Sequence, residues 1–247
     1  MEESDLNCNN KCAGSARYGN FNNYYNFHPV ENRVRLLPKY MNYVNKDQGN
    51  VVCLDVGCNT GDLTQALQKH VTKNFKSNEE DVNCQILAID LDQDLIAKAT
   101  AANENEKISF FCVDILTNDF QQLCSSFLEQ HKRKTFDIVF CFSVTMWIHI
   151  NYGDEGLKQF LVRLSEIADL LVVEPQPWKC YGRAVRRTKR ANSEPFAEYS
   201  GLKIRKDVES FIDNFLIKEC NLVRVLQSAP TSWGRQVNFY KNNQRSS

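Results

Sequence analysis

Five continuous apolar runs, each separated from the next by a segment of helical periodicity, most strongly limit how this chain can fold. The runs are 51–56, 85–90, 108–113, 136–142 and 169–174, and the helical patterns are 61–72, 93–102, 119–131 and 154–168. Continuous runs rich in Val, Ile and Phe are typical of strands that are covered on both faces. Alternation of such strands with helices predicts a mainly parallel sheet with right-handed crossovers.

The C-terminal part extends this pattern. A further helix is predicted at 206–220, and two more candidate strands follow at 222–227 and 235–240. The expected fold is therefore a Rossmann-like α/β domain, with a seven-stranded, mainly parallel sheet and helices on both faces. We expect residues 1–16 to be a disordered tail and 17–247 to form one domain, in which 17–45 cover the substrate and cofactor.

Composition limits the cellular setting. No apolar run approaches the roughly 20 residues that span a bilayer, and the N-terminal sequence MEESDLNCNNKC lacks the apolar stretch of a secretory signal. We therefore expect an intracellular protein, placed in the cytoplasm with the nucleus as the alternative.

The ten cysteines do not suggest a metal site. Five of them sit in or beside apolar runs and are expected to be small buried hydrophobic residues, namely Cys53, Cys58, Cys84, Cys112 and Cys141. Cys8 and Cys12 form a CxxxC pattern in the predicted tail, but no Cys or His cluster nearby completes a zinc site. We expect no metal cofactor.

The first apolar run ends in LDVGCNTGD, which is the first sign of a ligand site. Asp55 closes the predicted strand, and Gly57 and Gly61 flank the turn into the next helix. Glycine lets a backbone approach a ligand closely, and the start of the helix offers free N–H groups. The GxxxG spacing differs from the GxGxxG of pyrophosphate sites. It favours a loop that holds the amino-acid and ribose end of S-adenosylmethionine, with a ligand-free turn as the alternative.

The next three strands also end in residues that suit this cofactor. Asp90 ends the second strand, where a carboxylate accepts both hydroxyls of a ribose. Asp114, at the end of the third, is placed to accept the adenine amino group, and Ile115 to pack on the ring or to hydrogen-bond through its backbone. Phe142 and Ser143, at the end of the fourth, are expected on the opposite side of the cofactor. Ligands of open parallel sheets bind beyond the carboxyl ends of the strands, so the sequence predicts an S-adenosylmethionine-dependent methyltransferase.

The fifth strand leads into a basic segment, VEPQPWKCYGRAVRRTKR. Residues 178–206 hold nine Lys and Arg against two Glu, a net charge of +7 in a chain whose formal net charge is zero. The segment by itself is equally consistent with a solvated basic loop or helix. Beside a methyl-donor pocket, its cations together with Trp178 and Tyr181 suit a substrate rich in phosphates and stacking bases.

Three strings of the sequence, LDVGCNTGD, SVTMWIHINYGDEGL and VEPQPWKCY, strongly resemble the bicoid-interacting-protein-3 (Bin3) family of RNA methyltransferases, which methylate 5′-terminal phosphates of RNA. The resemblance extends from about Arg17 to Lys241. The pattern YGNFNNYYNFHPVENRVRLLP is similar to the branch that methylates 5′-monophosphates of small RNAs such as histidine tRNA and precursor microRNAs. The other branch caps a 5′-triphosphate end and has Lys where this chain has Met146, so the resemblance favours the monophosphate branch.

The resemblance implies cofactor contacts by Arg33, Asn59, Asp90, Asp114, Ile115 and Phe142. Arg33 is expected to meet the cofactor carboxylate, because no other fixed cation is evident near the first loop. Phe142 departs from the family, which has Met there, so a side-chain contact at this position would change in shape.

The chemistry implied is methyl transfer to a phosphate oxygen. A 5′-monophosphate is mostly dianionic at neutral pH and needs no general base, so alignment and charge stabilisation carry the reaction. The candidates to hold the other phosphate oxygens are Tyr25, His149, Lys179 and Tyr181, and a helix-packing role is the alternative for His149.

We expect a monomer that acts on a small RNA with a 5′-phosphate, without a membrane. Three alternatives remain at this point: 5′-triphosphate capping, a small-molecule or protein methyltransferase, and an inactive RNA-binding adaptor.

Overall fold

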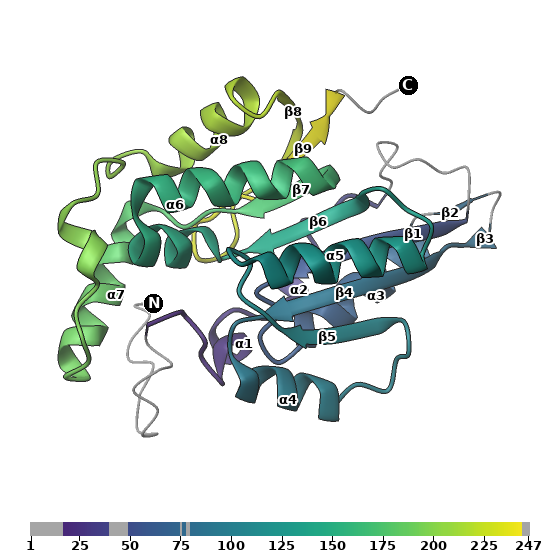
Figure 1. The fold of residues 1–247 in the computed structure, drawn as a ribbon, viewed down its shortest axis with the longest axis horizontal. Coiled ribbons are helices and arrows are strands. Elements are labelled where there is room, and N and C mark those ends of the chain that lie inside the picture. The colour runs from purple at the N-terminus through teal and green to yellow at the C-terminus, as the bar shows by residue number, and fades with distance from the viewer. Residues whose placement is uncertain (1–16, 40–48, 75, 78–79, 244–247) are drawn as a thin grey trace.

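A computed structural model describes residues 17–39, 49–74, 76–77 and 80–243 (Figure 1). The predicted tail 1–16, and the end of the predicted covering segment from 40 to 45, lie outside the described residues. The main sheet has seven strands in the order β5-β4-β1-β6-β7-β9-β8. The strands are β1 (Asn50–Val56), β4 (Asn83–Asp90), β5 (Ile108–Cys112), β6 (Phe136–Phe142), β7 (Ala168–Glu174), β8 (Leu222–Gln227) and β9 (Asn238–Asn242). The pair β2 (Lys76–Ser77) and β3 (Glu80–Asp81) forms a separate antiparallel ribbon.

The strand directions agree with the prediction of a mainly parallel sheet. β5, β4, β1, β6 and β7 pair in parallel, whereas β9 runs antiparallel to both β7 and β8. The chain order reverses between β1 and β6, so the loops after these two strands diverge at the carboxyl edge of the sheet. In such folds a ligand crevice opens at this point.

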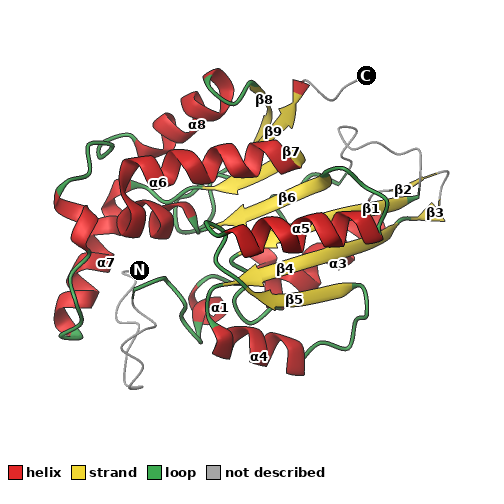
Figure 2. Cartoon of the chain, viewed as in Figure 1, coloured by secondary structure: helices red, strands yellow, loops and turns green. Residues whose placement is uncertain are grey.

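Helices cover both faces of the sheet (Figure 2). They are α1 (Tyr24–Phe27), α2 (Val30–Val34), α3 (Asp62–Asn74), α4 (Gln93–Ala101), α5 (Asn118–Gln130), α6 (Thr145–Ile167), α7 (Trp178–Arg190) and α8 (Val208–Lys218), with a 3₁₀ turn at Ala197–Ser200. One hydrophobic core joins the sheet to α5, α6, α7 and α8, and a second joins it to α2, α3 and α4. None of the helices described here is long and apolar enough to cross a membrane.

The central strand β6 shows why its sequence is apolar throughout. Val139 and Cys141 point into the core under α5 and α6, while Ile138 and Phe140 point into the core over α3. All four are completely buried. Because successive side chains of a strand face opposite sides, a strand covered on both faces needs an apolar residue at every position.

Two predicted elements differ from the structure. The helix predicted at 154–168 begins at Thr145, with a break at Gly153, whose φ of 74° is not helical. Its first turn is held by Gln176, which accepts hydrogen bonds from the Met146 N–H and the Thr145 hydroxyl, both at 3.0 Å. A partner 30 residues away leaves no local periodicity, so the sequence pattern missed this start.

The last strand was predicted at 235–240, but it is formed by Asn238–Asn242. Residues 231–235 form a turn instead, in which the Thr231 N–H donates to the Arg235 carbonyl at 2.6 Å and the Arg235 N–H donates to the Thr231 hydroxyl at 2.9 Å. The prediction therefore placed Arg235 in a strand, whereas it lies in a turn beside the carboxyl edge of the sheet.

Candidate functional site

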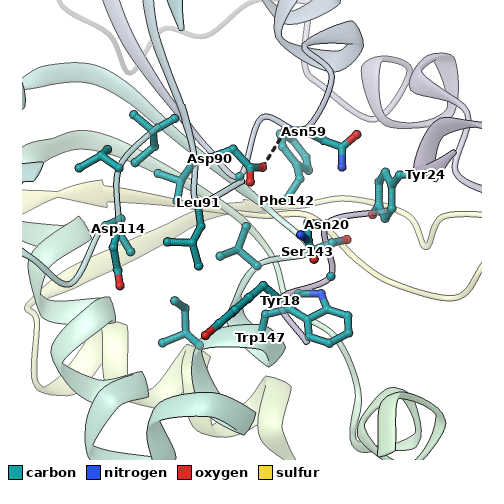
Figure 3. Close-up of a pocket in the computed structure, with 18 of the residues that line it drawn as sticks. Tyr18, Asn20, Tyr24, Asn59, Asp90, Leu91, Asp114, Phe142, Ser143 and Trp147 are labelled. Carbon is teal, nitrogen blue, oxygen red and sulfur yellow. Dashed lines mark hydrogen bonds between the residues drawn. The ribbon is translucent and has the colours of Figure 1, made fainter. Parts of the chain in front are cut away.

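A cavity opens beyond the carboxyl ends of the parallel strands, and we call it the donor cavity (Figure 3). It encloses about 810 Å³, part of which is open to solvent. Its lining comes from the strand-end loops and from the N-terminal segment: Tyr18, Gly19, Asn20, Tyr24, Val56, Gly57, Asn59, Ile89, Asp90, Leu91, Val113, Asp114, Ile115, Phe142, Ser143, Val144, Trp147, Ile148 and Tyr152. Six of the eight residues predicted to bind the cofactor line it.

The loop after β1 contributes Gly57 and Asn59 to the cavity wall. Gly57 has a φ of 75°, and a Cβ there would lie 2.5 Å from the Val144 side chain, so only glycine fits without strain. Two residues on, the Asn59 N–H donates to Asp90 Oδ2 at 2.9 Å. Asp90 Oδ1 accepts from the Asp92 N–H at 3.0 Å. Burial raises the pKa of Asp90, and these two hydrogen bonds oppose that rise. The carboxylate is thus held in one orientation on the wall, as a ribose acceptor requires.

Asp114 lies on another part of the same wall (Figure 3). Its Oδ1 accepts from the Leu116 N–H at 2.8 Å, and its Oδ2 accepts from the Tyr152 hydroxyl at 3.1 Å. Ile115 and Phe142 add apolar surface. Two fixed carboxylates and an apolar wall, over a glycine loop, fit the nucleoside part of S-adenosylmethionine, whose sulfonium carries an activated methyl group.

The N-terminal segment from Tyr18 to His28 closes one side of the cavity. A Cβ at Gly19 would overlap the indole of Trp147, so the segment passes directly against that ring. Phe21 of this segment contacts both the loop after β1 and helix α7. Its carbonyl accepts from Asn59 Nδ2 at 3.1 Å, and the guanidinium of Arg187 lies 4.9 Å from its ring centroid.

A second cavity, which we call the acceptor cavity, adjoins the first. It is lined by Phe21, Tyr24, Phe27, His28, Ser143, Met146, Trp147, Gln176, Cys180, Arg183, Arg187 and Arg235, and it encloses about 630 Å³ with its mouth included. Tyr24, Ser143 and Trp147 line both cavities. The described lining of the acceptor cavity contains three arginines and no acidic residue. A negatively charged group is therefore the favoured occupant.

A buried ion cluster forms the floor between the cavities. Glu174, at the end of β7, is fully buried and accepts from Arg33 Nε at 2.5 Å, from Trp233 Nε1 at 3.1 Å and from Arg235 Nη1 at 3.3 Å. Ser143 Oγ donates to Glu174 at 3.1 Å and accepts from Arg33 and Arg235 at 2.9 and 2.7 Å. Burial opposes ionisation of Glu174, but the two guanidinium groups prevail and hold its pKa at about 2.

Two predicted cofactor residues lie behind the donor cavity and do not line it. The Arg33 side chain is completely buried, and it also donates to the Tyr24 hydroxyl at 2.6 Å. Asp55 is buried and accepts from the Thr64 hydroxyl at 2.6 Å, and burial raises its pKa to about 6. Arg33 thus holds Tyr24 and Ser143, which line the cavity, and Asp55 packs behind the wall. Arg33 Nη1 has no hydrogen-bond partner among the described residues, and its contact with a cofactor carboxylate, which the family resemblance implies, stays a prediction.

None of the four predicted phosphate-holding residues lines the acceptor cavity as the structure describes it. The Tyr25 hydroxyl donates to the Cys58 carbonyl at 3.2 Å, beneath the loop after β1. Lys179 is exposed on α7, outside the described lining of both cavities. These residues were candidates because cations and hydroxyls can hold phosphate oxygens, but the direction of each side chain depends on tertiary packing.

His149 and Tyr181 form a buried link between α6 and α7. His149 is completely buried, with Nδ1 2.8 Å from the Tyr181 hydroxyl and Nε2 2.8 Å from Asp154 Oδ1. Asp154 also accepts from the N–H groups of Lys203 and Ile204. Both ring nitrogens of His149 are therefore engaged within the protein. The helix-packing alternative describes His149 correctly, and the phosphate-holding role does not.

The sequence pointed to the basic segment that carries Arg183 and Arg187, but not to His28 and Arg235. His28 and Arg235 line the acceptor cavity. Trp233 packs against His28 and donates to Glu174, and Glu174 also accepts from Arg235. Glu174 carried one local signal, since it ends a strand at the same edge as Asp90 and Asp114. Arg235 carried none, because only the turn at 231–235 brings it back to β7.

Comparisons with known proteins agree with this architecture. The fold resembles an O-methyltransferase family 2 protein from Planctomyces limnophilus, with a TM-score of 0.60 at 12% identity over 96% of this chain and 63% of that chain. A methyltransferase-domain model matches residues 54–168. The fold and the donor cavity define an S-adenosylmethionine-dependent methyltransferase of the Rossmann-like class.

Sequence relatives identify the family. The model of Bicoid-interacting protein 3 (Bin3) matches residues 136–242. A Xenopus laevis protein named pre-miRNA 5′-monophosphate methyltransferase is 42% identical over 92% of this chain and 93% of its own length. The Homo sapiens RNA 5′-monophosphate methyltransferase is 37% identical over 94% of this chain and 82% of its own length. The chain belongs to the Bin3 family of methyltransferases.

Replacement of Asp90 tests the donor cavity. Asp90→Ala removes charged acceptors, each worth about 1.5 to 3 kcal/mol, so S-adenosylmethionine should bind about tenfold to a hundredfold more weakly by calorimetry. The matched control is Asp119→Ala, an exposed aspartate on α5 that lines neither cavity. If the Asp90→Ala protein is folded and binds with unchanged affinity, Asp90 does not contact the cofactor.

Proposed function

We propose that this protein methylates the 5′-terminal monophosphate of small RNAs, with S-adenosylmethionine as methyl donor. The observation that carries the proposal is the junction of the two cavities at Tyr24, Ser143 and Trp147. On one side of the junction lie carboxylates suited to a nucleoside, and on the other lie three arginines suited to a phosphate. The names of the relatives, RNA and pre-miRNA 5′-monophosphate methyltransferase, support the same substrate.

The chain's own residues then have three tasks. Fixed carboxylates of the donor cavity orient the donor, arginines of the acceptor cavity hold the phosphate, and the segment from Tyr18 to His28 shields the junction from water. A phosphate monoester is mostly dianionic at neutral pH, so its oxygen attacks without a general base. The protein therefore contributes alignment of the attacking oxygen with the methyl group and charge stabilisation. The proposal includes a reaction without a metal ion, by a monomer in the cytoplasm.

Helix α7 extends the positive charge away from the acceptor cavity. Lys179, Arg183, Arg186 and Arg190 follow one another at steps of four, three and four residues, which places them on one face of the helix, and all four are exposed. The stripe spans about 16 Å at 1.5 Å per residue. The stripe begins beside the acceptor cavity. It is therefore placed to bind the phosphates that follow the 5′-terminal phosphate along the RNA.

Transfer of labelled methyl groups to RNA with different 5′ ends tests the proposal. RNA with a 5′-monophosphate should be methylated, RNA with a 5′-hydroxyl should not, and a 5′-triphosphate should be a poorer acceptor because Met146 supplies no additional cation at the acceptor cavity. Equal labelling of the 5′-hydroxyl RNA would contradict phosphate methylation. Preference for the triphosphate would instead favour a capping enzyme, and labelling of protein or small molecules without RNA would favour the other methyltransferase classes.

The α7 stripe makes a separate prediction. The Michaelis constant for RNA should rise with salt, and joint replacement of Arg186 and Arg190 by Ala should raise it further and weaken its salt dependence. A plot of log affinity against log salt has a negative slope. For each phosphate that is no longer bound, the magnitude of this slope should decrease by roughly 0.7 to 0.9. The double variant Lys107→Ala with Lys134→Ala is the control, because both lysines are exposed at the amino ends of strands. Parallel slopes for wild type and the α7 variant would mean that the stripe is a solvated surface.

A further inference from the structure

The acceptor cavity contains two basic side chains to which the sequence assigned no role, His28 and Arg235. His28 follows α1 and is 8% exposed, and its ring lies between Tyr24 and Trp233, at centroid distances of 4.8 and 4.7 Å. The Arg235 side chain is 9% exposed. They come from opposite ends of the chain and meet on the wall of the same cavity.

We propose that Arg235 and His28 together bind the 5′-terminal phosphate and determine specificity for a dianionic monoester. In this proposal, which rests on the proposed function, His28 takes up a proton as the phosphate enters.

The hydrogen bonds of Arg235 place it to bind a phosphate. Nη1 donates to Ser143 Oγ at 2.7 Å and to Glu174 Oε1 at 3.3 Å, which fixes the plane of the guanidinium. Nη2 lies 3.7 Å from Cys180 Sγ, a weak acceptor. A phosphate oxygen in the cavity is a far better acceptor than this thiol, and a guanidinium fork matches phosphate geometry. Ser143 lines both cavities, so a phosphate on Arg235 lies next to the donor.

Charge in the buried cluster also favours an anion there. Glu174 carries one negative charge against the two positive charges of Arg33 and Arg235, so the three side chains have a surplus of +1. Burying unbalanced charge is costly, and an anionic ligand offsets that cost. Arg183 and Arg187 add positive charge at the same cavity.

His28 responds to the charge of the ligand. Burial, followed by the charges of Arg235 and Arg33, lowers its pKa to about 3, so it is neutral at neutral pH; Arg187 acts in the same direction and Glu174 opposes them. A dianionic phosphate reverses the balance, because a nearby anion favours the protonated imidazole. Methylation leaves a monoanionic diester, whose weaker field holds the proton less firmly. The site thereby binds substrate more tightly than product and favours product release.

Proton uptake tests His28 directly. A short 5′-phosphorylated RNA should be bound by wild-type protein with more proton uptake than by His28→Gln, with a difference of at most about one proton, measured by calorimetry in buffers of different ionisation enthalpy. Ionisation of the phosphate itself contributes equally to both and cancels. Since binding takes up a proton, the affinity of the wild-type protein for the RNA should fall as pH rises through the pKa that His28 has in the complex. The affinity of His28→Gln should not show this decrease. Equal uptake in both proteins would overturn the role of His28.

Kinetics test Arg235. Arg235→Gln should raise the Michaelis constant for 5′-monophosphate RNA about tenfold to a hundredfold, and Arg235→Lys should have a smaller effect because it retains the charge but not the fork. The control is Arg35→Gln, an exposed arginine of the turn after α2 that lines neither cavity. Unaltered binding of S-adenosylmethionine by calorimetry shows that each variant is folded.

The outcomes separate the two proposals. If methyl transfer requires a 5′-phosphate but Arg235→Gln and Arg235→Lys both keep the wild-type Michaelis constant, the role of Arg235 is wrong and the proposed function stands. If a 5′-hydroxyl RNA is methylated as well as the phosphorylated one, the proposed function itself fails.

Discussion

The buried carboxylate of Glu174 is the interaction on which both cavities depend. It ends β7 in the middle of the carboxyl edge of the sheet and binds Arg33 from α2, Ser143 from the end of β6, and Trp233 and Arg235 from the turn before β9. These segments are far apart in the sequence. A buried pair of opposite charges contributes little net stability when compared with apolar side chains, but removal of one partner leaves an uncompensated charge and costs about 3 to 5 kcal/mol. The cluster therefore fixes the position of these segments relative to one another.

The hydrophobic pattern predicted most of the fold, and strand-end positions predicted part of the donor-cavity wall. Apolar runs are visible in the sequence because a strand such as β6 must be apolar on both faces, and carboxyl ends of parallel strands necessarily meet at one edge. Asp90 and Asp114 were therefore found from their positions alone. The acceptor cavity could not be found in this way. Its basic residues lie next to α1, on α7 and in a turn, and no periodicity relates His28 to Arg235.

The family motifs also include residues with structural tasks. In the string EPQPW, Gln176 accepts from the first turn of α6 and donates from Nε2 to the Ser143 carbonyl at 2.5 Å. In the string WIH with GDEGL, His149 and Asp154 join α6 to α7 and to the backbone at 203–204. His149 was one of the candidates to hold the phosphate, with helix packing as the alternative. The structure instead shows that such motifs hold the loops and helices that carry the binding residues.

Through Ser143, which lines both cavities, Glu174 aligns the donor cavity with the acceptor cavity. The most direct test is the single-turnover rate of methyl transfer by Glu174→Gln, with S-adenosylmethionine and 5′-monophosphate RNA both saturating and at a temperature where circular dichroism shows a folded protein. We predict a rate at least about a hundredfold below wild type, because small misplacement of reacting groups has effects of this size. A folded Glu174→Gln protein that transfers methyl groups at the wild-type rate would contradict the claim.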